Sequence, residues 1–284
     1  MIWGFTFLFI KVSVEGLSPL WLVSVRTLSG FAVLSLALRV RRVSIPRDRV
    51  TWLHIGFLAI PANVIPWAMV AWAQHGVTSA MTAVLYSLIP LMTLTISVAI
   101  SIESFTMRKL LGLVLAAIGT ALAVGFDLDS PGTGGAVVAV LVACALLAAG
   151  AVYAKRFVTP HVGALPMATV QLGIAFVVST PVALLVDGPL VWDRLTAAVL
   201  AASLTLGAVG TGLAFLLYYL LIESVGATNA TMVTYITPVI GIIAGGVFLD
   251  EPISATLLAG GAAIIGGIWV AQSVRRASID GLNV

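Results

Sequence analysis

The sequence has few charged residues and a single cysteine. Only 9% of its 284 residues are charged and 61% are apolar, whereas a soluble domain carries about a quarter charged residues. Too few charges remain to cover a solvated surface of this size, and the composition is the opposite of that of a disordered chain. Because Cys144 is the single cysteine and lies within an apolar run, the chain cannot form a disulfide framework. The composition therefore predicts a chain that lies mostly in lipid.

Carboxylates are also missing from the middle of every apolar run. The 11 acidic residues lie in or beside the polar breaks, and the three histidines lie at run ends. A proton-coupled exporter of cationic drugs usually needs a buried acid, so this absence disfavours that class. An intramembrane enzyme would need clustered acids, histidines or a nucleophile at one depth. We therefore expect no enzyme, no metal ion and no cofactor.

Apolar runs separated by short polar breaks fill the chain. Because the runs are continuous and do not alternate as membrane strands do, they predict transmembrane helices. The ten runs cover residues 1–15, 19–38, 50–73, 77–100, 108–125, 135–154, 163–186, 195–221, 227–248 and 254–273. The first run is short, and we expect the true start of the protein to lie upstream of it.

Basic residues in the breaks predict the orientation. With a cytoplasmic N-terminus, only Arg194 falls in an outside loop. The inside segments then hold Arg39, Arg41, Arg42, Arg47, Arg49, Arg108, Lys109, Lys155, Arg156, Arg275 and Arg276. This asymmetry predicts that both termini are cytoplasmic. It also explains the basic residues as topology signals, so we expect no nucleic acid partner.

The two halves of the chain share one plan. A shift of 148 positions places Pro90 on Pro238, Glu103 on Glu251, Gly112 on Gly260 and Gly119 on Gly267. We therefore expect one repeat at 1–127, a second at 132–273 and a cytoplasmic tail at 274–284. Because each repeat has an odd number of helices, the second enters the membrane in the opposite sense. Such inverted repeats are typical of alternating-access transporters.

The end of each half resembles a known family. GVTSAMTAVLYSLIPLMTLTISVAISIESFTMRKLLGLVLAAIGTALAV and VGATNATMVTYITPVIGIIAGGVFLDEPISATLLAGGAAIIGGIWVA are both similar to the end of an EamA repeat of the drug/metabolite transporter superfamily. Each has a small-residue opening, a mid-helix proline, a later glutamate and a glycine-spaced last helix. The resemblance implies a ten-helix bacterial inner-membrane carrier of small metabolites, often an exporter of amino acids, with helices five and ten at the periphery.

Two basic residues are candidates for binding a substrate. Arg26 lies seven residues after Pro19, roughly 10 Å into the second helix at 1.5 Å per residue. A charge at that depth usually faces a cavity or a partner, although a structural pairing between helices is the alternative. Lys11 is four residues from Glu15 and could instead reach the interface. Because the buried charges are basic, we expect a substrate that bears a carboxylate.

Uncharged polar residues mark further faces of the predicted helices. We expect the cavity to lie between these faces and take the pair Arg26 and Gln171 as its axis. The other candidates are Asn63 and Trp67 in the third helix, Tyr86 in the fourth, Thr211 and Tyr218 in the eighth, and Thr234 and Tyr235 in the ninth. Hydroxyl groups can also bond their own helix, so a structural role is the alternative.

Prolines and glycines are expected to shape the helices. Pro66, Pro90 and Pro238 predict kinks or hinges in the third, fourth and ninth helices. Gly112 and Gly119 share one face of the fifth helix, and Gly260 and Gly267 repeat that spacing in the tenth. Small residues allow close helix packing in lipid. We expect packing within the chain, with a homodimer contact as the alternative.

Together these features predict an all-α integral membrane protein with ten transmembrane helices in two inverted five-helix repeats. The predicted function is secondary transport of small metabolites by alternating access, with export of amino acids or related carboxylates as the leading hypothesis. The alternative is a proton-coupled multidrug exporter of the same superfamily. The expected partners are a small-molecule substrate and the lipid bilayer.

Overall fold

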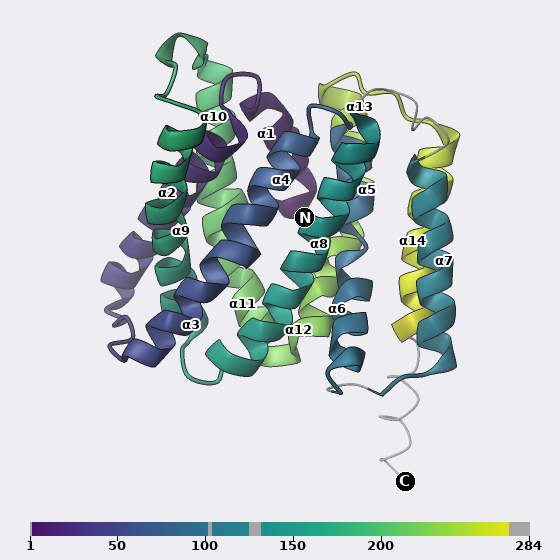
Figure 1. Ribbon diagram of the computed structural model, residues 1–284, viewed down its shortest axis with the longest axis horizontal. Helices are drawn as coiled ribbons and strands as arrows, with labels where there is room; N and C mark the ends of the chain where they lie inside the picture. The colour runs from purple at the N-terminus through teal and green to yellow at the C-terminus, as the bar shows by residue number, and fades with distance from the viewer. Residues whose placement is uncertain (1, 102–103, 125–131, 273–284) are drawn as a thin grey trace.

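The computed structural model describes residues 2–101, 104–124 and 132–272, apart from the side chains of residues 228, 232 and 235. Within these ranges the chain forms helices, turns and loops and contains no strand. Six helical segments are long and apolar enough to cross a membrane. With three shorter apolar helices and α7 (Met107–Val124), they make ten rods that lie side by side (Figure 1). The predicted all-helical membrane fold is confirmed.

The first five rods come from the first half of the chain. The third rod contains a π-helical turn, and the fourth is broken after Tyr86. In order they are α1 (Ile2–Ser13), α2 (Pro19–Arg41), α3 (Arg49–Ala59) with η1 (Ile60–Val64) and α4 (Ile65–Ala73), α5 (Ser79–Tyr86) with α6 (Ile89–Ala99), and α7. The predicted tail and most of the linker between the halves lie outside the described residues.

The second half repeats these irregularities at matching places. The eighth rod has a π-helical stretch where the third has one, and the ninth is interrupted where the fourth is. In order they are α8 (Thr133–Tyr153) with η2 (Ala154–Val158), α9 (Ala164–Val186), α10 (Ala197–Thr205) with η4 (Leu206–Leu213) and α11 (Ala214–Val225), α12 (Ala227–Ala230) with η5 (Thr231–Ile236) and α13 (Thr237–Phe248), and α14 (Ala255–Gln272). A short 3₁₀ turn, η3 (Trp192–Arg194), precedes α10.

The three predicted hinge prolines lie at these irregularities. Pro90 is in the first turn of α6 and Pro238 in the first turn of α13, so each follows a break in its rod. Pro66 is in the first turn of α4, directly after the π-helical turn. Proline lacks an N–H and crowds the preceding turn, which explains why the regular hydrogen-bond pattern stops at these points.

The last rods of the two halves, α7 and α14, pair at the edge of the bundle (Figure 1). A Cβ atom on Gly112 would lie 2.4 Å from the Gly267 carbonyl oxygen, and one on Gly260 would lie 2.5 Å from that of Gly119. Only glycine allows this approach, which agrees with close packing of small residues in lipid. The four glycines therefore pack within the chain, and a homodimer stays a prediction.

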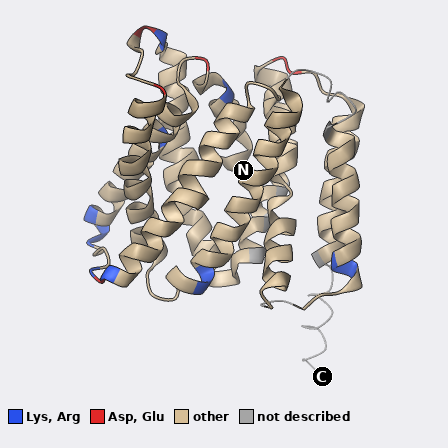
Figure 2. Cartoon of the chain, in the orientation of Figure 1, with Lys and Arg blue, Asp and Glu red and all other residues tan. Residues whose placement is uncertain are grey.

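Most charged residues lie at the two ends of the rods (Figure 2). We call one the acidic end; it holds the loops at 14–18, 74–78, 187–196 and 249–254. The opposite basic end holds the loops at 42–48 and 159–163 and the start of α7. Polar residues in these loops cap the next helix: Ser18, Asp48, Thr78 and Thr196 each accept a backbone hydrogen bond. The polar breaks of the sequence therefore start helices at defined residues.

Candidate functional site

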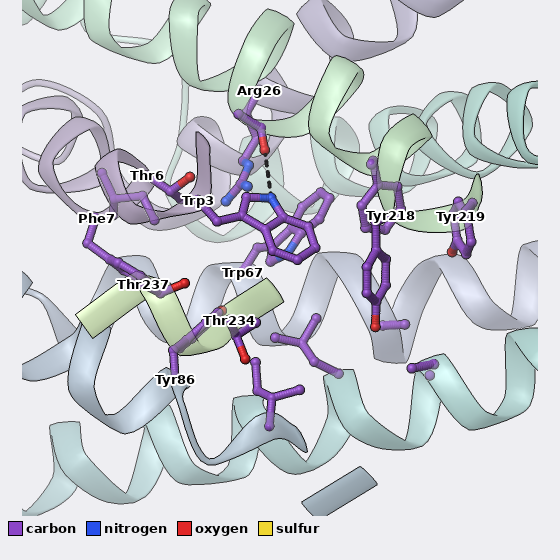
Figure 3. A pocket seen from close by; sticks show the side chains of 18 residues that line it. Trp3, Thr6, Phe7, Arg26, Trp67, Tyr86, Tyr218, Tyr219, Thr234 and Thr237 are labelled. Atoms are coloured by element: carbon purple, nitrogen blue, oxygen red, sulfur yellow. Dashed lines mark hydrogen bonds between the residues drawn. The ribbon is translucent and has the colours of Figure 1, made fainter. Parts of the chain in front are cut away.

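A cavity lies at the centre of the bundle (Figure 3). Its water-accessible volume is about 70 Å³, and its lining comes from both halves of the chain. The wall is mostly apolar, with aromatic rings from α1, α4, α5 and α11 and hydroxyl groups from α1, η5 and α13. Concave, largely apolar sites with a few converging polar groups are typical of small-molecule binding sites.

Arg26 supplies the charge in this cavity. Its side chain is only 4% exposed, and its Nε donates to the Thr211 hydroxyl at 3.1 Å. The guanidinium carbon lies 4.1 Å from the ring centre of Trp67, a cation–π contact. No ion pair involves Arg26 in the part of the chain that the structure describes. Burying a charge without a counter-ion is costly, so the cavity is electrostatically suited to an anionic group.

The π-helical stretch η4 fixes the position of Thr211. The Thr211 hydroxyl donates to the Leu206 carbonyl five residues earlier, and its oxygen can still accept the bond from Arg26. Gly207 and Gly210 lie in the same stretch, and a Cβ on Gly207 would lie 2.6 Å from the Arg26 carbonyl oxygen. The glycine-rich turn therefore brings η4 against α2 at the depth of Arg26. Single π turns are frequent at functional sites.

Aromatic rings form the wall next to Arg26. Trp3 donates from Nε1 to the Gly210 carbonyl at 3.1 Å, and its ring centre lies 5.0 Å from that of Tyr218. Trp67 meets Phe215 edge to face at 5.6 Å. In Figure 3 Arg26 points toward the two indoles, and Tyr218 stands beside them. These packed rings fix the direction of the guanidinium and leave little room around it.

A buried polar network supports the wall at Tyr219. Gln171 Nε2 donates to Asn63 Oδ1 at 2.5 Å, and the Tyr219 hydroxyl donates to Gln171 Oε1. Asn63 and Gln171 do not line the cavity, but Tyr219 does. The network joins η1, α9 and α11, so it ties the first half of the chain to the second at this depth.

Three hydroxyl-bearing residues line the opposite side of the cavity from Arg26 in Figure 3: Tyr86, Thr234 and Thr237. Thr234 donates to the Thr231 carbonyl of its own turn. The oxygens of Thr237 and of Thr6 on α1 are buried and have no hydrogen-bond partner within the structure. A buried hydroxyl without a partner is unfavourable, so these two groups are free to bind a solute or water.

Half of the ten residues predicted to bind substrate line the cavity. Arg26, Trp67, Tyr86, Tyr218 and Thr234 line the cavity. The other candidates lie behind the wall or elsewhere: Thr211 against Arg26, Asn63 and Gln171 in the polar network, and Lys11 at the acidic end. The Tyr235 side chain lies outside the described residues. The predicted axis is therefore asymmetric, because Arg26 faces the cavity whereas Gln171 supports Tyr219.

Trp3, Thr6, Tyr219 and Thr237 line the cavity but were not among the predicted site residues. Tyr219 follows Tyr218 directly, and neighbours on a helix point about 100° apart, so the pattern gave no reason to choose both. A phenol at mid-depth needs a partner, however, and that requirement could have linked Tyr219 to an amide. Thr6 and Thr237 give no comparable signal because threonine commonly bonds its own helix.

The fold and the site define a class of membrane protein. Multiple spanning helices enclose a small central cavity with one buried cation, aromatic rings and free hydroxyls, and broken rods meet beside it. Discontinuous helices around a midplane site are typical of secondary transporters.

Comparison with known proteins agrees with this class. The sequence model of the EamA-like transporter family matches residues 1–125 and again residues 134–272. The chain therefore belongs to the EamA-like transporter family, whose fold has two repeats.

Two relatives carry names that give no substrate. The chain is 28% identical over 252 residues to "Uncharacterized inner membrane transporter YedA" of Escherichia coli (strain K12), which covers 86% of this chain and 78% of that protein. It is 28% identical over 195 residues to "Uncharacterized transporter YvbV" of Bacillus subtilis (strain 168), covering 64% and 60%. A solved structure described only as "Crystal structure of protein" matches with a TM-score of 0.73 at 21% identity, covering 96% and 94% of the two chains. That likeness shows the fold alone.

Proposed function

We propose that this protein is a secondary transporter that binds carboxylate-bearing metabolites, amino acids above all, in the central cavity and exports them by alternating access. The carboxylate would contact Arg26, and the apolar part of the solute would lie against Trp3, Trp67 and Tyr218. The free hydroxyls of Thr6 and Thr237 would accept or donate the remaining hydrogen bonds.

The observation that carries the proposal is the uncompensated charge of Arg26. Its Nε donates to Thr211, whereas its terminal nitrogens donate to no residue that the structure describes. A guanidinium offers a planar pair of donors that matches a carboxylate. An anionic solute would satisfy these donors and the buried charge at once, which a cation or a neutral apolar solute cannot do.

The shape of the cavity supports a mechanism in which the helices move. About 70 Å³ of water-accessible volume holds a few water molecules, so the cavity must widen to admit an amino acid. The breaks before Pro90 and Pro238 and the π-helical stretches η1 and η4 all adjoin the cavity. Corresponding rods of the halves run in opposite senses (Figure 1), so equivalent movements would open opposite ends.

A bacterial inner-membrane location fits this function. The relative YedA is likewise named an inner membrane transporter. We propose that the basic end faces the cytoplasm, because Lys and Arg are retained on that side of membranes. The cytoplasmic placement of both termini is proposed on the same distribution of Lys and Arg.

A proton-coupled multidrug exporter is the competing function. The aromatic wall suits flat apolar cations, but none of the residues that line the cavity is acidic. A cation would then enter a site that already holds Arg26, and like charges repel at this depth.

Uptake into proteoliposomes tests the proposal. The purified protein is supplied with amino acids, organic anions and their methyl esters, with and without a pH gradient, and empty liposomes provide the control. We expect free carboxylates to be taken up faster than their esters, because the ester cannot form the charged pair with Arg26. Equal uptake of acid and ester, or uncoupler-sensitive efflux of cationic dyes without carboxylate transport, would contradict it.

A further inference from the structure

A second, larger hollow lies on the outside of the bundle. It has a volume of about 840 Å³ and shares no lining residue with the central cavity. Its walls come from α2, α9, the first turn of α3 and the loop between α2 and α3, all toward the basic end. We call it the α2–α9 groove. Its depth is apolar, with Phe31, Ile174 and Phe176 among the lining side chains.

Two arginines stand at the mouth of the groove. Arg39 and Arg42 line it and are exposed, and neither guanidinium has a hydrogen bond or ion pair to any residue that the structure describes. Arg42 ends α2 in the left-handed conformation, with φ of 53°. The next residue, Val43, then turns back and donates to the Leu38 carbonyl at 3.1 Å. The turn makes Val43 part of the groove wall beside Arg42.

Acidic side chains do not neutralise this mouth. Residues 39–49 contain five arginines and one acid, Asp48. The Asp48 carboxylate caps α3 by accepting from the Thr51 backbone N–H at 2.7 Å. The hydroxyl and the backbone N–H of Thr51 also lower the pKa of Asp48. The carboxylate is therefore engaged with its own helix, and a net positive charge remains above an apolar groove.

Trp52 marks the rim where the groove meets the polar loop. Its indole N–H donates to the Pro46 carbonyl at 2.8 Å, which fixes the ring, and the side chain is 38% exposed. Tryptophan with one wet and one apolar face is typical of the membrane interface. The groove therefore extends from headgroup depth, at Arg39, Arg42 and Trp52, into the apolar depth at Gly173 and Val177.

We propose that the α2–α9 groove is a binding site for an anionic phospholipid. Its phosphate lies between Arg39 and Arg42, and one acyl chain runs along Phe31, Gly173 and Val177. Basic pockets between helices at this depth attract anionic headgroups, and arginine pairs with phosphate through parallel N–H donors. Gly173 leaves the space beside Phe31 open, because a Cβ there would lie 3.0 Å from the Phe31 ring.

Native mass spectrometry tests the headgroup preference. The delipidated full-length protein is titrated with equal amounts of dioleoyl-phosphatidylglycerol and dioleoyl-phosphatidylcholine. We expect the first bound lipid to be phosphatidylglycerol. The double variant Arg39→Gln/Arg42→Gln should lower that preference by about tenfold, since both phosphate contacts are lost.

Matched variants separate the site from net charge. Arg47→Gln/Arg49→Gln removes the same charge from the same end, but neither residue lines the groove, so the preference should be kept. Arg39→Lys/Arg42→Lys should restore part of it, since lysine pairs with phosphate as a point charge. Equal loss in both glutamine variants would show only a diffuse attraction and would overturn the proposal.

Quenching of Trp52 fluorescence gives a second readout that needs no arginine variant. Phosphatidylglycerol with brominated acyl chains should quench the emission more strongly than brominated phosphatidylcholine. The difference between the wild type and Trp52→Phe isolates the signal of Trp52 from the other six tryptophans. Equal quenching by the two lipids would show that the groove holds only bulk lipid, which would contradict a site for anionic lipid.

Discussion

Each end of the bundle has a lysine that caps a helix, and the first half of the chain supplies one of these lysines and the second half the other. At the acidic end, Lys11 Nζ donates to the Gln74 carbonyl at 2.5 Å and to the Val77 carbonyl at 3.4 Å. At the basic end, Lys155 Nζ donates to the Ile222 and Glu223 carbonyls at 3.0 and 3.1 Å. Each lysine ends the first rod of its half and caps the third, where the helix dipole favours a cation.

At the acidic end a carboxylate also joins the two halves. The Glu251 carboxylate accepts from the Ser79 backbone N–H at 2.8 Å, the Ser79 hydroxyl at 2.8 Å and the Ala80 backbone N–H at 3.0 Å. It caps the start of α5 from the loop after α13. Its counterpart by the sequence repeat, Glu103, lies outside the described residues. Both ends therefore carry a lysine cap, and Glu251 adds three hydrogen bonds between the halves at the acidic end.

Removing the Glu251 carboxylate should cause the largest loss of stability at either end of the bundle. Glu251→Ala removes three hydrogen bonds to a charged acceptor, and we expect a loss of about 2 to 3 kcal/mol and a lower thermal unfolding midpoint in detergent. Asp250→Asn is the matched control, because Asp250 is exposed with φ of 51° and asparagine tolerates that conformation. Equal midpoints for Glu251→Ala and the control would show that the contact does not hold the acidic end.

Removing either lysine cap should have a smaller effect, and the two substitutions should favour opening of opposite ends. Lys11→Gln should favour opening of the acidic end and Lys155→Gln that of the basic end, each by about 1 kcal/mol or roughly fivefold in population. A single cysteine at the cavity, Thr6→Cys in a Cys144→Ala background, reports opening through its labelling by an impermeant maleimide from each membrane face.

Charge-matched controls accompany these variants. Arg194→Gln removes a charge from the acidic end and Arg156→Gln from the basic end, and both residues are exposed. Neither control should change the ratio of labelling from the two faces. If Lys11→Gln and Lys155→Gln moved that ratio in the same direction, the two caps would not act on opposite ends.

Tyr219→Phe should have the smallest effect on the opening of the two ends. The variant removes the hydrogen bond to Gln171 and should cost about 1 kcal/mol of stability. The network lies at the depth of the cavity, between the ends, so the ratio of labelling from the two faces should stay as in the wild type. A changed ratio in the labelling assay would mean that the polar network, and not only the caps, biases one end.

The sequence predicted the fold more fully than it predicted the site. Backbone polar groups in lipid must be hydrogen-bonded within a helix or a closed barrel, and the apolar runs do not alternate as barrel strands do. The rods could therefore be predicted from the continuous apolar runs. The glycines of α7 and α14 also repeat with a fixed spacing, and they pack these helices together. These features depend on local pattern, which is why they could be predicted.

The site depends on contacts between distant segments. Nothing local distinguishes Arg26, which faces the cavity, from Gln171, which turns to Asn63 and Tyr219. The sequence around Lys155 and Arg156 predicts only a topology signal, whereas Lys155 caps α11 across 67 residues of sequence. The π-helical stretch η4, which positions Thr211, packs closely against α2, and no periodicity in the sequence indicates it.

The most direct measurement compares transport of one carboxylate solute and its methyl ester by the wild type, Arg26→Gln and Arg26→Lys in proteoliposomes. We predict that the preference for the free acid falls at least about tenfold in Arg26→Gln, because a buried charge pair is lost, and is partly kept in Arg26→Lys. An unchanged preference in Arg26→Gln, in protein that unfolds at the wild-type temperature, would contradict the assignment of Arg26 as the group that selects the substrate.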